Sequence, residues 1–142
     1  MDLRLECIRY KSLNARQKEN YNFQKVSAVL ADYGFTTLRL TDDWQGADFI
    51  AQHIDNETFI KVQLKSRLSF DSKYRGKNLY IAFHSDGTWY LFPHDAVLET
   101  FLSKTNIRQT KSWRKLRKYS FPRLSEQAKV LLGTYKIYPH DN

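Results

Sequence analysis

Apolar residues recur along the first third of the chain at two different spacings, which separate the first expected elements. Over residues 14–33 they fall three or four positions apart, which predicts a helix that Gly34 can end in the left-handed conformation. Residues 35–40 are β-branched and aromatic and predict a strand. The polar run 41–46 predicts a loop.

The middle of the chain contains short runs rich in apolar residues that are separated by turn residues, as successive strands are. Residues 48–54 and 58–65 predict two strands joined by a tight turn, and a long basic loop is expected over 66–77. Residues 78–84 and 89–92 predict a second hairpin, because Asp86-Gly87 supplies the positive φ angles of a tight turn.

The last part of the chain predicts further helices. One is expected from Pro93 to about Leu102, a short one over 125–132, and a strand over 134–138. The order of elements predicts an α/β fold, with a small, mostly antiparallel mixed sheet flanked by helices. A chain of 142 residues is expected to form a single domain, with a core over about 14–102 and a basic C-terminal extension over 103–142.

Composition narrows the class of protein. Hydrophobic residues make up 42% of the chain and aromatic residues 15%, which favours a packed globule. No apolar run approaches the roughly 20 residues of a membrane span, and the first residues lack a signal-peptide pattern. We therefore expect a cytoplasmic protein without a membrane partner. Cys7, the single cysteine, excludes an internal disulfide, and the spacing of the histidines argues against zinc.

Positive charge is concentrated in one segment. The chain has 23 basic and 15 acidic residues, and residues 101–125 contain eight basic residues and no acid. That segment accounts for the whole net charge of +8. Basic residues interleaved with aromatic ones are typical of a surface that binds nucleic acid, although a solvated helix face has the same composition.

Three polar side chains on the central predicted strands carry the candidate chemistry. Asp48 opens one strand, and Gln63 and Lys65 stand two positions apart on the next, so both face the same side. Carboxylate and amide oxygens are ligands for Mg²⁺ or Mn²⁺, and a lysine can orient water or balance negative charge. The pattern predicts a metal-dependent site for phosphodiester hydrolysis.

Such a site calls for a second acid, since Gln63 is uncharged. Glu19 on the first helix is the candidate, and Asp42 or Asp43 can compensate in its place. A purely structural interpretation is also open. Glutamine and lysine are typical of the exposed face of a strand, and Asp48 can cap a turn. His53 lies an odd step from Asp48 and is predicted to be a packing or turn residue.

The arrangement resembles the PD-(D/E)XK nuclease superfamily over about residues 19–102. A helix, a strand, Asp48 opening a second strand, a hairpin and then Gln63-Leu64-Lys65 follow the order of that motif. Gln63 replaces the usual acid, as in the group I intron-associated homing endonucleases, and residues 89–95 resemble the strand end downstream of the family's lysine. The resemblance implies a restriction-endonuclease-like core, Mg²⁺ dependence, a DNA substrate and often a dimer.

These observations together predict a Mg²⁺-dependent DNA endonuclease that forms a dimer or larger homo-oligomer. Asp48, Gln63 and Glu19 are expected to hold the metal and Lys65 to act on the attacking water. The residues expected to contact the DNA backbone are Lys73, Arg75, Lys77, Lys111, Arg114, Lys115, Arg117 and Lys118. The alternatives are a catalytically inactive nucleic-acid-binding module with the same fold and an accessory protein-interaction subunit.

Overall fold

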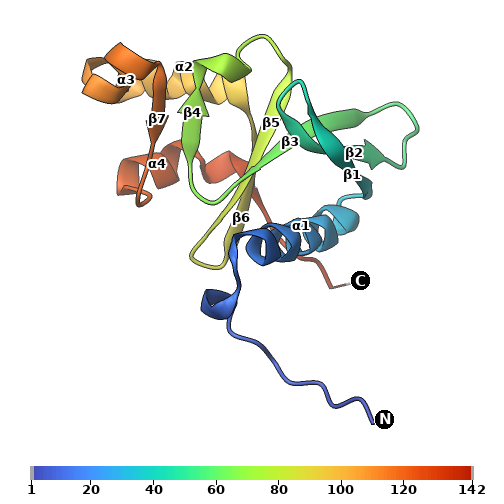
Figure 1. Ribbon diagram of the computed structural model, residues 1–142. Helices are drawn as coiled ribbons and strands as arrows, with labels where there is room; N and C mark the ends of the chain where they lie inside the picture. The colour runs from blue at the N-terminus through green and yellow to red at the C-terminus, as the bar shows by residue number, and fades with distance from the viewer. Residues whose placement is uncertain (1, 142) are drawn as a thin grey trace.

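A six-stranded sheet with helices on both faces forms the body of the protein (Figure 1). The computed structural model describes residues 2–141. The helices and strands are α1 (Ala15–Asp32), β1 (Phe35–Trp44), β2 (Ala47–His53), β3 (Phe59–Lys65), β4 (Ser69–Asp71), β5 (Leu79–Ser85), β6 (Thr88–Pro93), α2 (His94–Lys104), α3 (Lys111–Leu116), β7 (Lys118–Ser120), α4 (Glu126–Leu131) and β8 (Lys136–Ile137). Short 3₁₀ turns include η1 (Tyr10–Ser12) and η2 (Ser72–Tyr74). The predicted class, an α/β fold with a mixed sheet flanked by helices, is confirmed.

The order of strands in the large sheet is β1-β2-β3-β5-β6-β8. Neighbouring strands are antiparallel except β3 and β5, which run parallel at the centre of the sheet. The strands β4 and β7 form a separate antiparallel pair. The strand of the Gln-X-Lys motif, β3, therefore lies between an antiparallel neighbour, β2, and a parallel neighbour, β5.

Helix α1 covers one face of the sheet. Asn14 caps its first turn, since the Asn14 side chain accepts a hydrogen bond from the Gln17 N–H at 2.9 Å. The Gln17 side chain in turn accepts a hydrogen bond from the Asn14 N–H, which completes a capping box. Val26 and Leu30 are fully buried against the sheet residues Phe49, Ala51, Val62 and Ala82. Burial of each large apolar side chain contributes about 1.5–3 kcal/mol, so this face fixes α1 firmly over β2 and β3.

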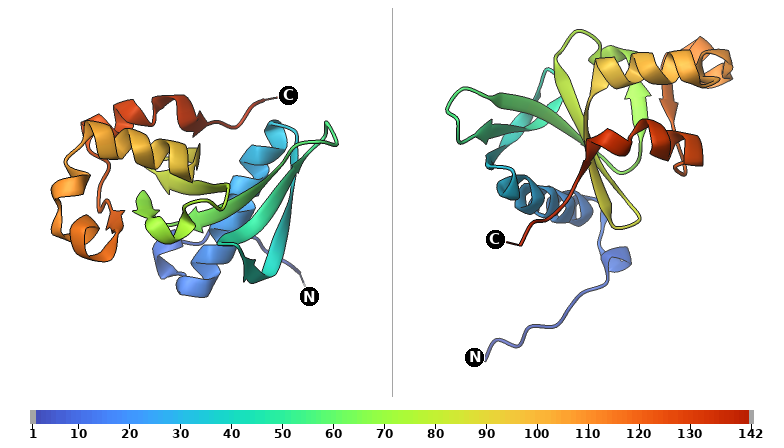
Figure 2. Two further views of the ribbon diagram at one scale, coloured as in Figure 1. Left: turned by 90° about the horizontal axis from the view of Figure 1, so that it is seen from above. Right: turned by 180° about the vertical axis from the view of Figure 1, so that it is seen from behind.

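The opposite face of the sheet is covered by α2, α3, α4 and the β4–β7 pair (Figure 2). The second half of the chain supplies Ile107, Trp113, Ala128 and Leu132 to the same buried cluster as Ile81, Phe83 and Phe92 of the sheet. The basic segment is therefore anchored on the sheet through its apolar residues while its charges stay outside.

Two predicted loops contain regular structure. β1 continues through Thr41 to Trp44, and the turn to β2 is made by Gln45 and Gly46, whose φ angles are 53° and 87°. The predicted loop over 41–46 is therefore mostly strand. The register shifts between Arg39 and Trp44, and beyond this irregularity Trp44 pairs again with β2, at Ala47. The predicted loop over 66–77 contains β4 and η2, because β4 finds its partner far along the chain in β7.

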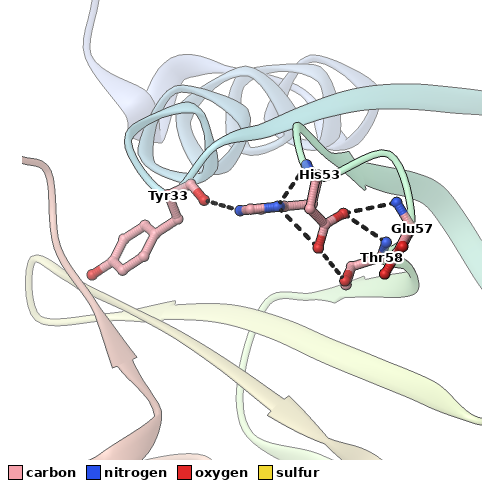
Figure 3. Close-up of polar contacts among 5 residues, drawn as sticks. Tyr33, His53, Glu57 and Thr58 are labelled. Carbon is pink, nitrogen blue, oxygen red and sulfur yellow. Dashed lines mark hydrogen bonds and ion pairs between the residues drawn. The ribbon is translucent and has the colours of Figure 1, made fainter.

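Both predicted hairpin turns are confirmed. Asp86 and Gly87 adopt positive φ angles of 48° and 79°. In the β2–β3 turn the Asp55 carboxylate accepts hydrogen bonds from the Thr58 hydroxyl and the N–H groups of Thr58 and Glu57 (Figure 3). These bonds lower the pKa of Asp55 to about 2.

His53 is a turn residue, as predicted. Its Nε2 contacts the Tyr33 carbonyl at 3.0 Å and its Nδ1 accepts the Asp55 N–H at 3.1 Å (Figure 3). The ring joins the end of α1 to the β2–β3 turn.

Within residues 2–141, no helix is both long and apolar enough to cross a membrane.

Candidate functional site

The β2–β3 hairpin brings Asp48 beside Gln63. The ladder pairs Phe49 with Val62, and the same register carried one step further sets Asp48 opposite Gln63. Asp48 Oδ2 accepts a hydrogen bond from the Leu64 backbone N–H at 2.8 Å. The carboxylate is thereby held against the strand that carries the Gln-X-Lys motif.

A pocket of about 650 Å³ lies between α1 and this hairpin. The predicted residues Glu19, Asp48, Gln63 and Lys65 all line it. Glu19 reaches the pocket from the first turns of α1, where its side chain is exposed, whereas the other three are half-buried. Residues that the sequence separates by up to 46 positions thus share one cavity, counting from Glu19 to Lys65.

Asp48 lies in an environment that disfavours its charge. Burial raises the pKa of the Asp48 carboxyl above its ordinary value of 3.8, and the nearby carboxylates Asp43 and Glu19 raise it further. The Leu64 N–H and the Lys65 ammonium act in the opposite direction. A bound cation would reduce the repulsion between these carboxylates and stabilise the ionised form of Asp48.

The acids do not form a preassembled ligand shell. Among residues 2–141, no three His, Cys, Asp or Glu side chains converge closely enough to hold a metal ion. The oxygen donors that line the pocket include the Gln63 amide and four carboxylates, those of Glu19, Asp42, Asp43 and Asp48. Their hard oxygen chemistry fits Mg²⁺ or Mn²⁺ better than a softer metal.

Lys65 stands at the edge of the pocket against an aromatic ring. Its Nζ lies 5.4 Å from the centroid of Tyr74, and Lys73 Nζ lies 5.1 Å from the same centroid. Tyr74 is buried, so it gives Lys65 a fixed wall. The basic turn that begins at Lys73 is therefore linked to the candidate site through the Tyr74 ring, which Lys65 and Lys73 share.

Lys61 shares the strand face of Gln63 but takes a structural role. Its Nζ donates hydrogen bonds to Gln45 Oε1 at 2.6 Å and to the Lys77 carbonyl, and lies over the Trp44 ring. Lys61 therefore ties the β1–β2 turn to the segment before β5.

The pocket also contains residues that the sequence did not single out. Tyr10, Asn22 and Arg39 line it, and Arg39 lies 5.3 Å from the Phe23 ring centroid. Arg39 lies on the predicted strand 35–40, so strand alternation could have indicated which face of the sheet its side chain occupies. Tyr10 offered no signal of this kind, since it precedes the first predicted helix.

The two basic segments that were predicted separately form one surface. The Ser72 N–H donates to the Arg117 carbonyl at 2.9 Å, and Asp71 pairs with Lys118 in the β4–β7 ladder. We call the exposed side chains of this region the basic surface: Lys73, Arg75, Lys111, Arg114, Lys115, Arg117 and Lys118. Arg75 is also ion-paired with Glu99 at 3.0 Å, and Lys77 is half-buried.

Comparison with known proteins yields structural similarity of modest extent. No protein-family model matches the chain, and a search of curated proteins finds no match. Among solved structures, the protein is similar to Hjc of Archaeoglobus fulgidus, a Holliday junction resolvase from an archaeal hyperthermophile. The TM-score is 0.39 with 15% sequence identity, over 49% of this chain and 74% of the resolvase. A similarity of this size carries no functional argument, and the comparisons give no support to a homing-endonuclease branch.

Proposed function

We propose that the protein is a divalent-metal-dependent nuclease that hydrolyses phosphodiester bonds in DNA at the pocket between α1 and the β2–β3 hairpin. The observation that carries this proposal is the shared pocket of Glu19, Asp48, Gln63 and Lys65. The chain order of helix, strand, Asp48 strand, hairpin and Gln-X-Lys strand is also the order of the PD-(D/E)XK motif. Both features support a nuclease with a restriction-endonuclease-like core.

Asp48 and Gln63 are the proposed metal ligands, with Glu19 or Asp43 as an added acid. Asp48 commits Oδ2 to the Leu64 N–H, which leaves Oδ1 to meet a cation. Bound Mg²⁺ or Mn²⁺ would supply Lewis-acid stabilisation of charge on the phosphate. Because Gln63 is neutral, we expect weaker metal binding than at a site with two ligating carboxylates.

Lys65 is the proposed catalytic cation. It lines the pocket beside Asp48 and is fixed against the Tyr74 ring at 5.4 Å. From that position the ammonium can orient the attacking water through a hydrogen bond and balance the negative charge that grows on the phosphate oxygens. A fixed donor requires less rearrangement during the reaction than a mobile surface lysine.

The basic surface is the proposed contact for the DNA backbone. Its charges lie on η2, α3 and β7, and the turn at Lys73 connects it to the pocket through Tyr74. Phosphate contacts of this kind position a duplex without reading its sequence. Self-association as a dimer or larger oligomer stays a prediction, and sedimentation of the purified protein would test it.

Cleavage of supercoiled plasmid tests the proposed function. In Mg²⁺ or Mn²⁺ we expect nicked or linear product, and none in EDTA. Asp48→Asn and Lys65→Met should each lower the rate by about 100-fold or more, whereas the matched surface variants Asp86→Asn and Lys129→Met should leave it unchanged.

Two results would overturn the proposal. Cleavage that persists in EDTA or in both site variants would place the activity outside this pocket. An intact plasmid together with salt-sensitive binding would identify an inactive nucleic-acid-binding module, the alternative that the neutral Gln63 favours.

A further inference from the structure

A second cavity of about 470 Å³ adjoins the candidate site beside η1 and the first half of α1. Four residues, Tyr10, Asn22, Lys65 and Ser66, line both cavities, so the two adjoin each other. Lys65 stands at their boundary. A ligand group bound in the second cavity would therefore lie next to the phosphate that Lys65 is proposed to contact.

Aromatic rings form the walls of this second cavity. Tyr10 and Tyr21 are tilted against each other with ring centroids 5.2 Å apart, and His84 meets Trp89 edge to face at 5.1 Å. Trp89 is buried and supports His84, which is exposed on the strand β5. The rings are thus held in place by packing, and His84 and Tyr10 remain accessible to a ligand.

The charge of the lining differs between the two cavities. The first is lined by four acids together with basic residues (Glu19, Asp42, Asp43 and Asp48 with Lys18, Arg39 and Lys65), whereas no described acid lines the second. The second instead has Lys25, whose Nζ lies 5.2 Å from the Tyr21 ring centroid, and Lys65. Aromatic faces combined with ammonium groups suit a ligand that is both planar and anionic, which is the chemistry of a nucleotide.

We propose that the second cavity binds an unpaired nucleobase that flanks the scissile phosphate. Bases within a continuous duplex are stacked on one another, so a base can reach these rings only after it leaves the stack. The substrate class that fits is therefore DNA with an unpaired, frayed or branched segment at the cleavage point. This inference rests on the proposed nuclease function for the position of the phosphate.

Binding of labelled oligonucleotides by the wild-type protein in EDTA tests the inference without any cleavage. One duplex carries 2-aminopurine in a paired position, and a matched duplex carries it in an unpaired position. We expect the unpaired form to bind about 10-fold more tightly, with its fluorescence quenched by stacking on aromatic side chains.

Variants of the exposed ring identify the cavity. His84→Ala should weaken binding of the unpaired form by about 5- to 100-fold and abolish the quenching, and His84→Phe should restore both. Tyr138→Ala, which removes an exposed aromatic side chain outside the cavity, should change neither. Thermal melting of each variant shows whether it is folded, and Tyr21→Ala serves as a second cavity variant.

The outcomes separate this inference from the nuclease proposal. Equal binding of the two duplexes, or quenching that is unchanged in both His84→Ala and Tyr21→Ala, would overturn the nucleobase site. Tyr10 and Tyr21 would then serve only to anchor η1 on α1. Site-specific quenching by a protein that cleaves no DNA would support the nucleobase site and overturn the nuclease.

Discussion

Oδ2 of Asp48 accepts a hydrogen bond from the backbone N–H of Leu64 at 2.8 Å, across the two strands that carry the candidate site. A backbone donor holds the carboxylate in one orientation before any ligand binds. Burial raises the pKa of Asp48, and this bond opposes the rise, so the contact also favours the ionised form. The same hydrogen bond therefore orients the proposed metal ligand and partly offsets the effect of burial on its pKa.

Gln63→Glu should strengthen metal binding. The change adds a carboxylate opposite Asp48 and supplies the charge that the natural glutamine lacks. We expect Mn²⁺ affinity, measured by calorimetry, to rise by about 10-fold, as a gain of about 1.4 kcal/mol implies. Gln52→Glu, on the exposed end of β2, is the matched control and should leave the affinity unchanged. A lower affinity in Gln63→Glu would contradict the proposed ligand pair.

Loss of charge on α3 and β7 should reduce the salt dependence of DNA binding. Each phosphate contact adds about 0.9 to the slope of log affinity against log salt, so the triple variant Arg114→Gln, Lys115→Gln and Lys118→Gln should lower the slope by about 2 to 3. Fluorescence anisotropy at several salt concentrations measures it. Lys129→Gln is the control, because its ammonium is already paired with Glu126 at 3.3 Å. A triple variant with the wild-type slope would exclude this surface.

His94 should make stability fall in mild acid. The ring is buried, its Nε2 accepts the Asp71 N–H at 3.2 Å, and its Nδ1 contacts Asp95 Oδ1 at 2.8 Å. Burial lowers the pKa of His94 below its ordinary value of 6.5, Asp95 and Asp71 oppose that shift, and Arg75 adds to it.

The sign of the His94 effect follows from proton binding. Below about pH 6.5 His94 is protonated in the unfolded chain but stays neutral in the folded protein, where its pKa is lower. The free energy of unfolding therefore decreases as the pH falls from about 6.5 toward the folded pKa. Thermal melting from pH 7.5 to 5.0 should show the decline, and His94→Gln should reduce it. An identical decline in both proteins would contradict this role.

Gly34→Ala should destabilise the fold. Gly34 has a φ of 87°, and an added Cβ would lie 2.9 Å from His53 Nε2. The strain and the displaced ring should cost about 1–3 kcal/mol in the free energy of unfolding, measured with urea. Gly133→Ala is the matched control, since Gly133 has no left-handed φ and a Cβ there meets no atom within 4 Å. Equal stability of the two variants would refute the close approach.

Local patterns predicted the parts of the fold that depend on neighbouring residues. The helix α1 with its glycine stop and both hairpins depend on periodicity and turn residues, and these were predicted within a few positions. The pairing of β4 with β7 depends on residues about fifty positions apart, which no local pattern reveals. The basic loop at 66–77 was therefore predicted without its strand.

The candidate site follows the same division. Alternation along β3 correctly placed Gln63 and Lys65 on one face, and the hairpin register set Asp48 beside them. The proximity of Asp43 to Asp48 depends on the extension of β1 beyond Leu40, where the sequence predicts a loop. The wall at Tyr74 depends on the long-range β4–β7 contact, so the sequence alone could not indicate it.

The parallel pairing of β3 with β5 has a consequence for the order of folding. The β1–β2–β3 meander needs only short turns, whereas β5 can join β3 only after residues 66–78 have crossed over. We expect the meander to assemble early and the β3–β5 ladder to form in a slower, later step. Asp48 and Gln63 would then be neighbours in a transient species in which β5 has not yet paired with β3 beside the candidate site.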